Sequence, residues 1–329
     1  MKQRKLGQDG PVVGAVGYGA MSFTDFYGPA DDADGPRILE ACLDLGITHL
    51  DTSNVYGMGR SETVIGKWLK SRKGENPFII ASKVGITRDP DHRFNNSPEH
   101  MARELDASLS RLGVDAIDLY YVHRRDPRFE IEEVAETMAG FVKTGKVKAI
   151  GFSEIAPSSL RRAHAVHPVA AVQSEYSLST RLPELGLVQT CAELGTALVA
   201  FSPVGRALLT DRPHNREAVE KLPFLASNPR FTEPNLSANL AYNARFCDLT
   251  SEMGVAAATL AIAWVLHKGE HVFAIPGTRK ITHLEEVAAG GALDLSADDL
   301  ARIDAVLPVG WAHGNRYSTA QSVGPEGYC

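Results

Sequence analysis

Apolar runs of strand length alternate with amphipathic segments of helical length along most of the chain. Because short apolar runs bounded by polar residues are typical of buried strands, we expect eight core strands. They lie at residues 15–19, 48–53, 78–84, 116–123, 147–153, 170–176, 197–204 and 272–278. Before them, residues 4–7 and 11–16 flank a turn at Gln8–Gly10, which predicts a short β-hairpin ahead of the first core strand.

Between the strands, apolar residues recur three and four positions apart, which is the spacing of one face of an α-helix. Ser61 and Ser97 stand where an N-cap is expected, Pro98 falls in a first turn, and Gly46 and Gly145 follow last turns. The clearest apolar faces are Ile38, Leu39, Cys42 and Leu45; Val64, Ile65, Trp68 and Leu69; Met101, Leu105, Leu109 and Leu112; and Ile131, Val134, Met138 and Phe141.

This alternation fits either a closed parallel barrel or a doubly wound open sheet. An open sheet would carry a glycine fingerprint after its first strand, but Gly14, Gly17 and Gly19 lack the G-x-G-x-x-G spacing. A barrel gathers functional residues at the C-terminal ends of several strands, and six predicted strands end in polar side chains. These are Asp51, Lys83, His123, Ser153, Gln173 and Ser202. The sequence therefore predicts one α/β domain over residues 1–329, a (β/α)8 TIM barrel whose bottom is capped by the N-terminal β-hairpin.

Two segments exceed what a minimal barrel needs. Residues 205–254 follow the seventh strand and contain four prolines, so we expect an excursion over the barrel mouth before two helices resume. The tail beyond Pro308 is polar and rich in glycine. From the sequence, this tail either folds against the mouth or stays loose.

Composition narrows the class of protein. The chain has 329 residues, 44% hydrophobic and 22% charged, with a formal net charge of −6. Without a basic stripe, this balance argues against nucleic-acid and anionic-membrane partners. The basic start leads into no apolar signal segment, and the longest apolar stretch, 254–266, is too short to cross a bilayer. We therefore expect a cytoplasmic protein.

The cysteines and the paired histidines give no metal site or disulfide framework. Cys42, Cys191, Cys247 and Cys329 lie far apart without paired spacing, which favours free thiols. His164 and His167 are three positions apart on a predicted helix, but no third ligand accompanies them, so we expect no bound metal.

Seven blocks of sequence, in order, resemble the aldo-keto reductase family. They are GITHLDTSNVYGMGRSETVIGKWL at 46–69, ASK at 81–83, DLYYVH at 118–123, GKVKAIGFS at 145–153, QSEYSL at 173–178, FSPVGR at 201–206 and IPGTRK at 275–280. HRRDP at 123–127 and the QSEYSL block are similar to a bacterial and plant branch that includes pyridoxal-reductase-like members. The resemblance implies NADPH-dependent reduction of an aldehyde or ketone.

The resemblance places a catalytic tetrad on Asp51, Tyr56, Lys83 and His123. Carbonyl reduction puts negative charge on oxygen, so a proton donor must stand beside it, and Tyr56 is the expected general acid. The ordinary pKa of a phenol, about 10, is too high for efficient donation near neutrality, and the Lys83 ammonium would lower it. Asp51 is expected to hold Lys83 in place, while His123 orients the carbonyl oxygen or shares the proton.

The resemblance also implies NADP(H) as the cofactor. Ser153, Glu154 and Gln173 match positions that bind the nicotinamide carboxamide, although many relatives carry Asn where this chain has Glu154. Phe201 matches the aromatic residue that stacks against the nicotinamide. The pyrophosphate is expected against Ser202, Pro203, Val204, Gly205 and Arg206, and the nicotinamide ribose near Gly19, Ala20 and Met21.

The adenosine end of the cofactor is expected along residues 276–286. Pro276 and Gly277 lead into Thr278, Arg279 and Lys280, which resemble the 2′-phosphate clamp of the family, and His283 and Glu286 stand where the family contacts adenosine. Thr282 and Glu285 have the spacing of a capping box, which predicts a helix start with its positive end near the site. Val287 departs from the usual Asn.

Two functions of other classes compete with the reductase. One is an NADP(H)-binding sensor, like the ion-channel β-subunits of the family, which the complete tetrad disfavours. The other is a Schiff-base aldolase using Lys83, which Asp51 disfavours by keeping the amine protonated.

The substrate is expected to be a small carbonyl compound, and neither its identity nor the oligomeric state follows from the sequence. Arg124 either meets an anionic substrate or binds Asp126. The pocket candidates are Met21, Phe23, Tyr27, Tyr56, Arg124 and the loops after the fourth and seventh strands.

Overall fold

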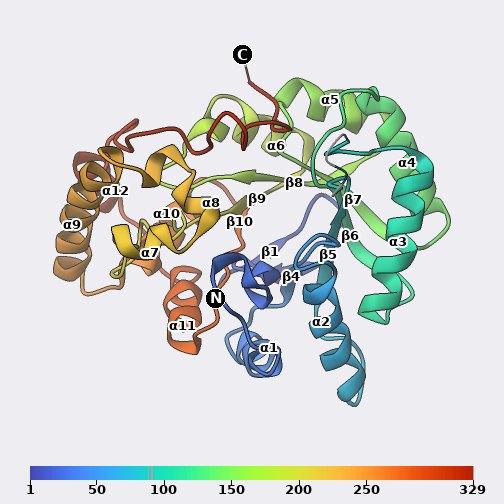
Figure 1. Cartoon of the computed structure of the whole chain (residues 1–329), viewed down its shortest axis with the longest axis horizontal. Helices are drawn as coiled ribbons and strands as arrows, with labels where there is room; N and C mark the ends of the chain where they lie inside the picture. Colours follow the sequence, from blue (N-terminus) through green and yellow to red (C-terminus); the bar gives the residue numbers. More distant parts are fainter. Residues whose placement is uncertain (88, 90–91, 329) are drawn as a thin grey trace.

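In the computed structural model, which describes residues 1–87, 89 and 92–328, eight parallel strands form one curled sheet (Figure 1). Strands that are consecutive in the chain are neighbours in the sheet. The sheet closes on itself where Val16 bridges Ala274 in parallel, with the Gly17 N–H donating to the Ala274 carbonyl. The predicted barrel is therefore confirmed. Its strands are β3 (Tyr18–Gly19), β4 (His49–Asp51), β5 (Ile79–Val84), β6 (Ile117–Val122), β7 (Val147–Ser153), β8 (Val169–Glu175), β9 (Ala197–Phe201) and β10 (Val272–Ala274).

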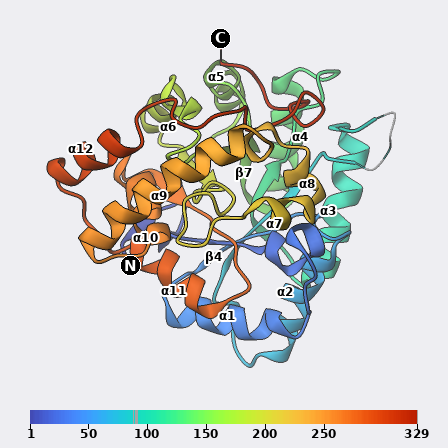
Figure 2. The same cartoon turned by 60° about the vertical axis from the view of Figure 1, so that its left-hand side comes forward.

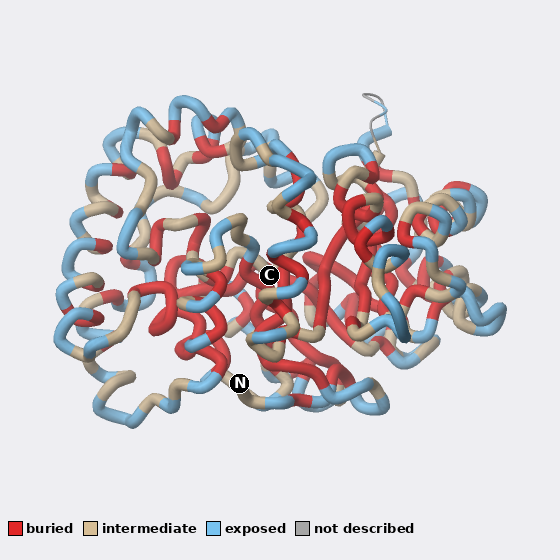
Figure 3. Tube along the Cα trace, turned by 90° about the horizontal axis from the view of Figure 1, so that it is seen from below, coloured by how far each residue is buried: buried red, intermediate tan, exposed pale blue. Residues whose placement is uncertain are grey.

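Helices follow the strands and cover the outside of the barrel. Their apolar faces turn inward, so that buried residues gather on the strands and on the inner sides of the helices (Figure 3). The covering helices are α1 (Asp34–Asp44), α2 (Arg60–Ser71), α3 (Pro98–Leu112), α4 (Ile131–Lys143), α5 (Pro157–Val166), α6 (Leu187–Leu194), α10 (Ala257–His267) and α11 (Ile281–Gly290).

Four further helices depart from the minimal barrel: α7 (Arg216–Glu220), α8 (Pro223–Ala226), α9 (Asn235–Met253) and α12 (Ala297–Val306). Short 3-10 turns are η1 (Ala20–Phe23), η2 (Asp25–Tyr27), η3 (Leu182–Glu184) and η4 (Pro229–Phe231). Within residues 205–254, α7, α8 and η4 come first, and two longer helices, α9 and α10, then follow, as expected. Helix α9 packs beside α12, where Arg302 pairs with Glu252 at 2.6 Å (Figure 2).

Within the described residues, one bent pair of helices has the length and apolar composition of a membrane span. No single helix of the described chain combines the length and the apolar composition needed to cross a bilayer. Helices α9 and α10 reach that length and composition only together, and they are bent by 89° at their junction. All ten residues Ala257–Leu266 of α10 are buried.

The N-terminal hairpin closes the barrel from below. Strands β1 (Gln3–Lys5) and β2 (Val12–Gly14) pair antiparallel. Leu6 and Val13 pack with inward-facing barrel residues such as Leu119, Tyr121 and Phe273. Gly7 has a φ of +82°, and a Cβ there would lie 2.7 Å from the Ala170 carbonyl oxygen, so the hairpin approaches β8 at a position where only glycine fits. The predicted cap is confirmed.

The predicted helix starts are only partly confirmed. Ser97 caps α3 by accepting from the His100 N–H, as expected. Ser61 does not cap α2: it lies inside the first turn, fully buried, and its hydroxyl donates to the Ala20 carbonyl. Helix α11 starts at Ile281 with no side-chain cap, so the capping box at Thr282 and Glu285 is wrong as well. Capping motifs are short, and the direction in which the entering chain approaches decides which residue becomes the cap.

Cys42, Cys191 and Cys247 are free thiols, as expected, and Cys329 lies outside the described residues.

Candidate active site

A buried lysine lies at the centre of the C-terminal end of the barrel. The Lys83 Nζ forms an ion pair with Asp51, donates to the Thr52 carbonyl at 2.8 Å, and lies 3.2 Å from the Tyr56 hydroxyl oxygen. Lys83 is fully buried and Asp51 nearly so. Asp51 ends β4, Lys83 lies near the end of β5, and Tyr56 stands in the loop after β4. Adjacent parallel strands therefore bring three tetrad members into direct contact.

His123, the fourth member, follows β6 and faces Tyr56. The two rings lie edge to face with centroids 5.8 Å apart. The His123 Nδ1 lies 3.2 Å from the Ser53 hydroxyl, which fixes the orientation of the ring. Burial, and then the charges of Lys83 and Arg124, hold the pKa of His123 well below its usual value. His123 is therefore a neutral imidazole near neutrality.

The ionisation of the lysine–tyrosine pair is set by burial and by mutual charge. Burial disfavours a charged Lys83, but Asp51 and Tyr56 outweigh it and raise the pKa of the ammonium. Burial also raises the pKa of Tyr56, and Lys83 opposes that rise. Near neutrality Tyr56 thus carries its proton beside a permanent positive charge, which stabilises the phenolate once the proton leaves.

Residues expected at the nicotinamide end lie on the neighbouring strands. The Gln173 side chain on β8 donates to Asp51 Oδ2 at 2.7 Å, so it is tied directly to the tetrad. Ser153 ends β7, and its hydroxyl accepts from Arg124 Nη1 at 3.1 Å. Phe201 ends β9 with its side chain half-buried. The Glu154 carboxylate is turned toward the C-terminal tail, where it pairs with Arg316.

Left-handed backbone conformations gather near these strand ends. The non-glycine residues with positive φ in the described chain are Met58, Glu154, Ser202, Arg206 and Ala207, which follow β4, β7 and β9. Such conformations cost about 1–3 kcal/mol each and persist mainly at ligand-binding and catalytic sites. The turn 205–207, with φ values of 59°, 56° and 71°, is three consecutive left-handed residues after β9. Turns of successive backbone N–H groups suit an anion such as a pyrophosphate.

Arg206 is the middle residue of this turn, and a carboxylate engages its guanidinium. Its Nη2 pairs with Glu175 Oε2 at 2.6 Å, and both side chains are buried. The guanidinium also lies 5.4 Å from the Phe224 ring and 5.2 Å from the Tyr317 ring. Helix α8 and the tail therefore meet above Arg206. Ser202, Pro203, Val204 and Gly205 lead from the end of β9 to Arg206.

The strand ends expected at the nicotinamide ribose and at the adenosine end of the cofactor also lie together. The Gly19 N–H donates to the Pro276 carbonyl, and the Tyr18 hydroxyl to the Thr278 carbonyl at 2.7 Å. Ala20 and Met21 continue into η1, Gly277 links Pro276 to Thr278, and His283 and Glu286 lie on α11.

Arg279 has a role that the sequence did not indicate. Its Nη1 donates to the Gly28 and Pro29 carbonyls at 2.7 and 2.6 Å, and its Nη2 to the Tyr27 carbonyl at 2.7 Å. It thereby holds the loop after η2, while the Lys280 side chain is exposed.

The structure places Phe23 in the core and gives Arg124 partners other than Asp126. Phe23 is buried against Tyr18, with ring centroids 5.3 Å apart, so it belongs to the core. Asp126 pairs with Arg128 at 2.6 Å, so one of the two alternatives for Arg124, binding to Asp126, is not observed. Arg124 instead donates to the His123 carbonyl and to Ser153.

Sequence reasoning missed several residues of the site. Ser53 stands in the same block as Asp51 and could have been found from that position. Glu175 lies in the QSEYSL block, so its place at a strand end was also visible. Arg316 carried no signal, because only the folding of the tail brings it to the strand ends.

Comparisons with known proteins agree with this geometry. A model of the Aldo/keto reductase family matches residues 15–308. Probable aldo-keto reductase 1 from Glycine max is 40% identical over 319 residues, covering 95% of this chain and 91% of the relative. The Schizosaccharomyces pombe aldo-keto reductase yakc, whose name includes NADP(+), is 35% identical over 302 residues, covering 90% and 88%.

Among solved structures, the glycerol dehydrogenase AKR11B4 from Gluconobacter oxydans is similar with a TM-score of 0.80 and 26% identity, over 93% of this chain and 94% of that one. The family match and the relatives both extend over nearly the whole chain. This chain therefore belongs to the aldo/keto reductase family and is an oxidoreductase.

Proposed function

We propose that this chain reduces an aldehyde or ketone with NADPH, and that Tyr56 is the general acid. The observation that carries the proposal is the buried Lys83, which contacts both Asp51 and the Tyr56 hydroxyl oxygen. A lysine held in this way is fixed in position and remains charged. It lies where it stabilises the oxygen of a tyrosine that gives up its proton.

NADP(H) fits the strand ends that surround the tetrad. The strained turn 205–207, the amide of Gln173 and the hydroxyl of Ser153 offer donors and acceptors suited to a dinucleotide. The name of the Schizosaccharomyces pombe relative supports NADP(+) over other carriers. When bound, the reduced cofactor supplies the hydride.

The four tetrad residues would then have separate roles in catalysis. Tyr56 transfers its proton to the carbonyl oxygen, and the Lys83 ammonium stabilises the phenolate left behind. If Ser53 donates to His123 Nδ1, the Nε2 carries the ring hydrogen and can orient the carbonyl oxygen by donating to it. Asp51 keeps Lys83 protonated and in place.

The same contacts argue against a Schiff-base aldolase. A lysine nucleophile must lose its proton, and a lowered pKa is the usual means. In this chain the pKa of Lys83 is raised, because Asp51 and Tyr56 overcome the effect of burial. Lys83 therefore suits an electrostatic role.

Replacing Tyr56 with phenylalanine tests the proposal. We expect Tyr56→Phe to lower kcat by about 100- to 10,000-fold, the usual contribution of general acid catalysis, and to leave the Kd of NADPH within about twofold. The measurements are steady-state kinetics on a panel of aldehydes and fluorescence titration of NADPH.

Tyr242→Phe is the matched control, because Tyr242 packs on α9 against Trp311, away from Lys83. It should leave kcat unchanged. Near-normal turnover in Tyr56→Phe would rule out Tyr56 as the acid.

A further inference from the structure

The C-terminal tail after α12 folds against the end of β7. It runs across the side of the barrel that carries α5 and α6 (Figures 1 and 2). The Glu326 N–H donates to the Glu154 carbonyl at 2.9 Å, and the Glu326 carboxylate accepts from the Ala156 N–H at 2.8 Å and from Arg125 at 2.6 Å. The tail therefore holds the backbone from the Glu154 carbonyl to the Ala156 N–H, which resolves the two alternatives left open by the sequence.

Glu154 is also held through its side chain. The carboxylate is buried, with its Oε1 accepting from the Glu175 N–H at 2.8 Å and the Ser174 hydroxyl at 3.2 Å, and its Oε2 paired with Arg316 of the tail. Burial opposes ionisation, but the Arg316 guanidinium outweighs it and holds the pKa of Glu154 below its usual value. The φ of Glu154 is +58°, so its backbone is strained too.

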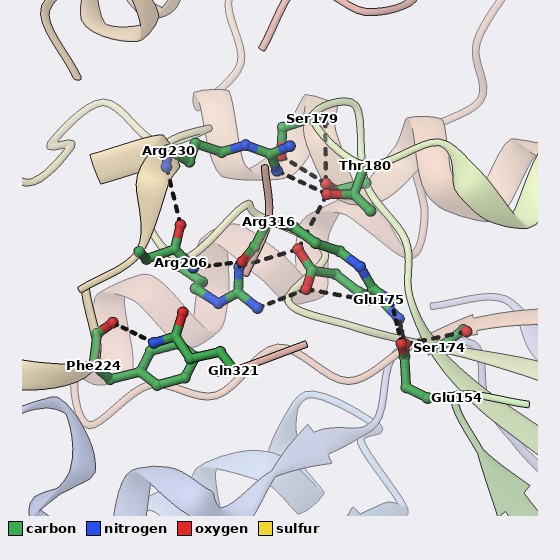
Figure 4. A network of polar contacts seen from close by, with 12 residues as sticks. Glu154, Ser174, Glu175, Ser179, Thr180, Arg206, Phe224, Arg230, Arg316 and Gln321 are labelled. Carbon is green, nitrogen blue, oxygen red and sulfur yellow. Dashed lines mark hydrogen bonds and ion pairs between the residues drawn. The ribbon is translucent and has the colours of Figure 1, made fainter. Parts of the chain in front are cut away.

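Arg316 is itself fixed by residues far apart in the sequence. The Asn228 side chain donates to its carbonyl oxygen, and its Nη1 lies 3.6 Å from Glu175 Oε2. Glu175 in turn pairs with Arg206 (Figure 4). A single tail arginine thus bridges the carboxylates at the ends of β7 and β8.

A chain of hydrogen bonds leads from this pair to the tetrad. The Glu154 N–H donates to the Gln173 carbonyl at 2.9 Å, and the Gln173 side chain donates to Asp51 at 2.7 Å. Ser153, whose hydroxyl accepts from Arg124, directly precedes Glu154. Glu154 is therefore joined through its backbone to both Ser153 and Gln173.

We propose that Arg316 is a positioning residue, which acts through Glu154 to hold the Ser153–Gln173 edge in the arrangement that receives the nicotinamide end of NADPH. This inference rests on the proposed function, in which that edge binds nicotinamide. A buried carboxylate that loses its ion-pair partner is left uncompensated, and the surrounding structure must rearrange or admit water to solvate it. The rearrangement would fall on the end of β7, next to the nicotinamide, and the adenosine end would be spared.

The direct test is Arg316→Met, which removes the charge and keeps an apolar stem against Tyr317. We expect the Kd of NADPH to rise at least about tenfold, equivalent to about 1.4 kcal/mol. The Kd of adenosine 2′,5′-bisphosphate, which lacks the nicotinamide, should change less than about twofold. Both constants are measured by calorimetry on the full-length chain, and circular dichroism checks the fold.

A second variant tests whether the effect passes through the carboxylate. Glu154→Gln in the Arg316→Met background removes the uncompensated charge, so we expect it to recover most of the lost NADPH affinity. Arg316→Lys should keep more affinity than Arg316→Met, because the cation is retained. Arg302→Met is the matched control: Arg302 pairs with Glu252 on the α9–α12 surface, and its loss should leave both Kd values unchanged.

Each outcome bears on the proposal. An equal loss of affinity for NADPH and for the bisphosphate, or no recovery in the double variant, would show that Arg316 only supports the fold. If Arg316→Met does not fold, the proposal stands or falls on Arg316→Lys and on the double variant. Failure of the unaltered protein to oxidise NADPH with any aldehyde or ketone would instead overturn the proposed function, and the inference with it.

Discussion

At the scale of single residues, the protein carries a histidine that is costly to protonate. His49 on β4 is fully buried, and neither ring nitrogen has a hydrogen-bond partner within the described chain. Burial is the main cause that lowers the pKa of His49 to about 4, from an ordinary value of about 6.5. The folded state therefore keeps this ring neutral where an unfolded chain would protonate it.

This difference makes the free energy of unfolding depend on pH. Between pH 4 and 6.5 the unfolded chain binds more protons at this site than the folded one, so stability rises with pH across that window and is lost as pH falls below 6.5. The full effect is on the order of 3 kcal/mol. Urea unfolding of His49→Leu at several pH values should show a shallower acid loss than the unaltered protein.

His267→Gln, at an exposed histidine, serves as the control and should follow the unaltered curve. The same acid dependence in His49→Leu would mean that other groups govern acid unfolding.

At the scale of elements, close helix packing depends on Gly66 in α2. A Cβ at this position would lie 2.1 Å from the Arg111 carbonyl oxygen at the end of α3, and backbone cannot yield as a side chain can. We therefore expect Gly66→Ala to lower the free energy of unfolding by about 1–3 kcal/mol, the usual range for overpacking. In α4, a Cβ at Gly140 would have no neighbouring atom within 4 Å. Gly140→Ala should therefore raise the free energy of unfolding by about 0.5–1 kcal/mol, because alanine favours the helix.

The stabilities of Gly66→Ala and Gly140→Ala are compared through the midpoints of their denaturant unfolding curves. The substitution is the same in both, so helix propensity cancels and the difference isolates the α2–α3 contact. Equal stability in the two variants would contradict the assigned role of Gly66.

A second prediction at this scale concerns the loop 278–280 and cofactor choice. Both Nη atoms of Arg279 are used on carbonyls of residues 27–29, whereas Lys280 is exposed. We expect a preference for NADPH over NADH of at least about tenfold, since bonds to a charged phosphate contribute about 1.5–3 kcal/mol. Lys280→Met should reduce that preference by weakening the binding of NADPH and not that of NADH. Arg279→Ala should weaken the binding of both cofactors, because residues 27–29 lose the guanidinium that holds them.

Fluorescence titration of both cofactors against both variants measures this division. If Arg279→Ala loses affinity for NADPH while its affinity for NADH is unchanged, Arg279 leaves the loop to bind the 2′-phosphate.

At the scale of the whole molecule, chain that lies outside the repeating strand–helix units packs against both ends of the barrel. The hairpin fills the bottom with Leu6 and Val13, and the tail reaches the ends of β7 and β8 through Arg316 and Glu326. One core cluster runs from Ala15 to Trp311. We therefore propose that residues 1–329 behave as one domain.

The sequence by itself determined the barrel and most of the tetrad geometry. Strand and helix periodicity is local, and a parallel barrel must bring successive strand ends together. The positions of Asp51 and Lys83 at the ends of two successive strands are therefore enough to make them neighbours. The hairpin at the bottom followed from its position before the first strand. Family blocks then gave these positions their roles.

The tertiary structure decided which charges meet. Glu154 with Arg316, Arg206 with Glu175, and Arg279 with the carbonyls of residues 27–29 join segments separated by up to about 250 positions. No local pattern encodes such partners, because a guanidinium can satisfy its donors on any carboxylate or carbonyl that packing brings near. Caps at Ser61 and Thr282 failed for a related reason. The path of the entering chain, set by contacts elsewhere, decided where each of those helices begins.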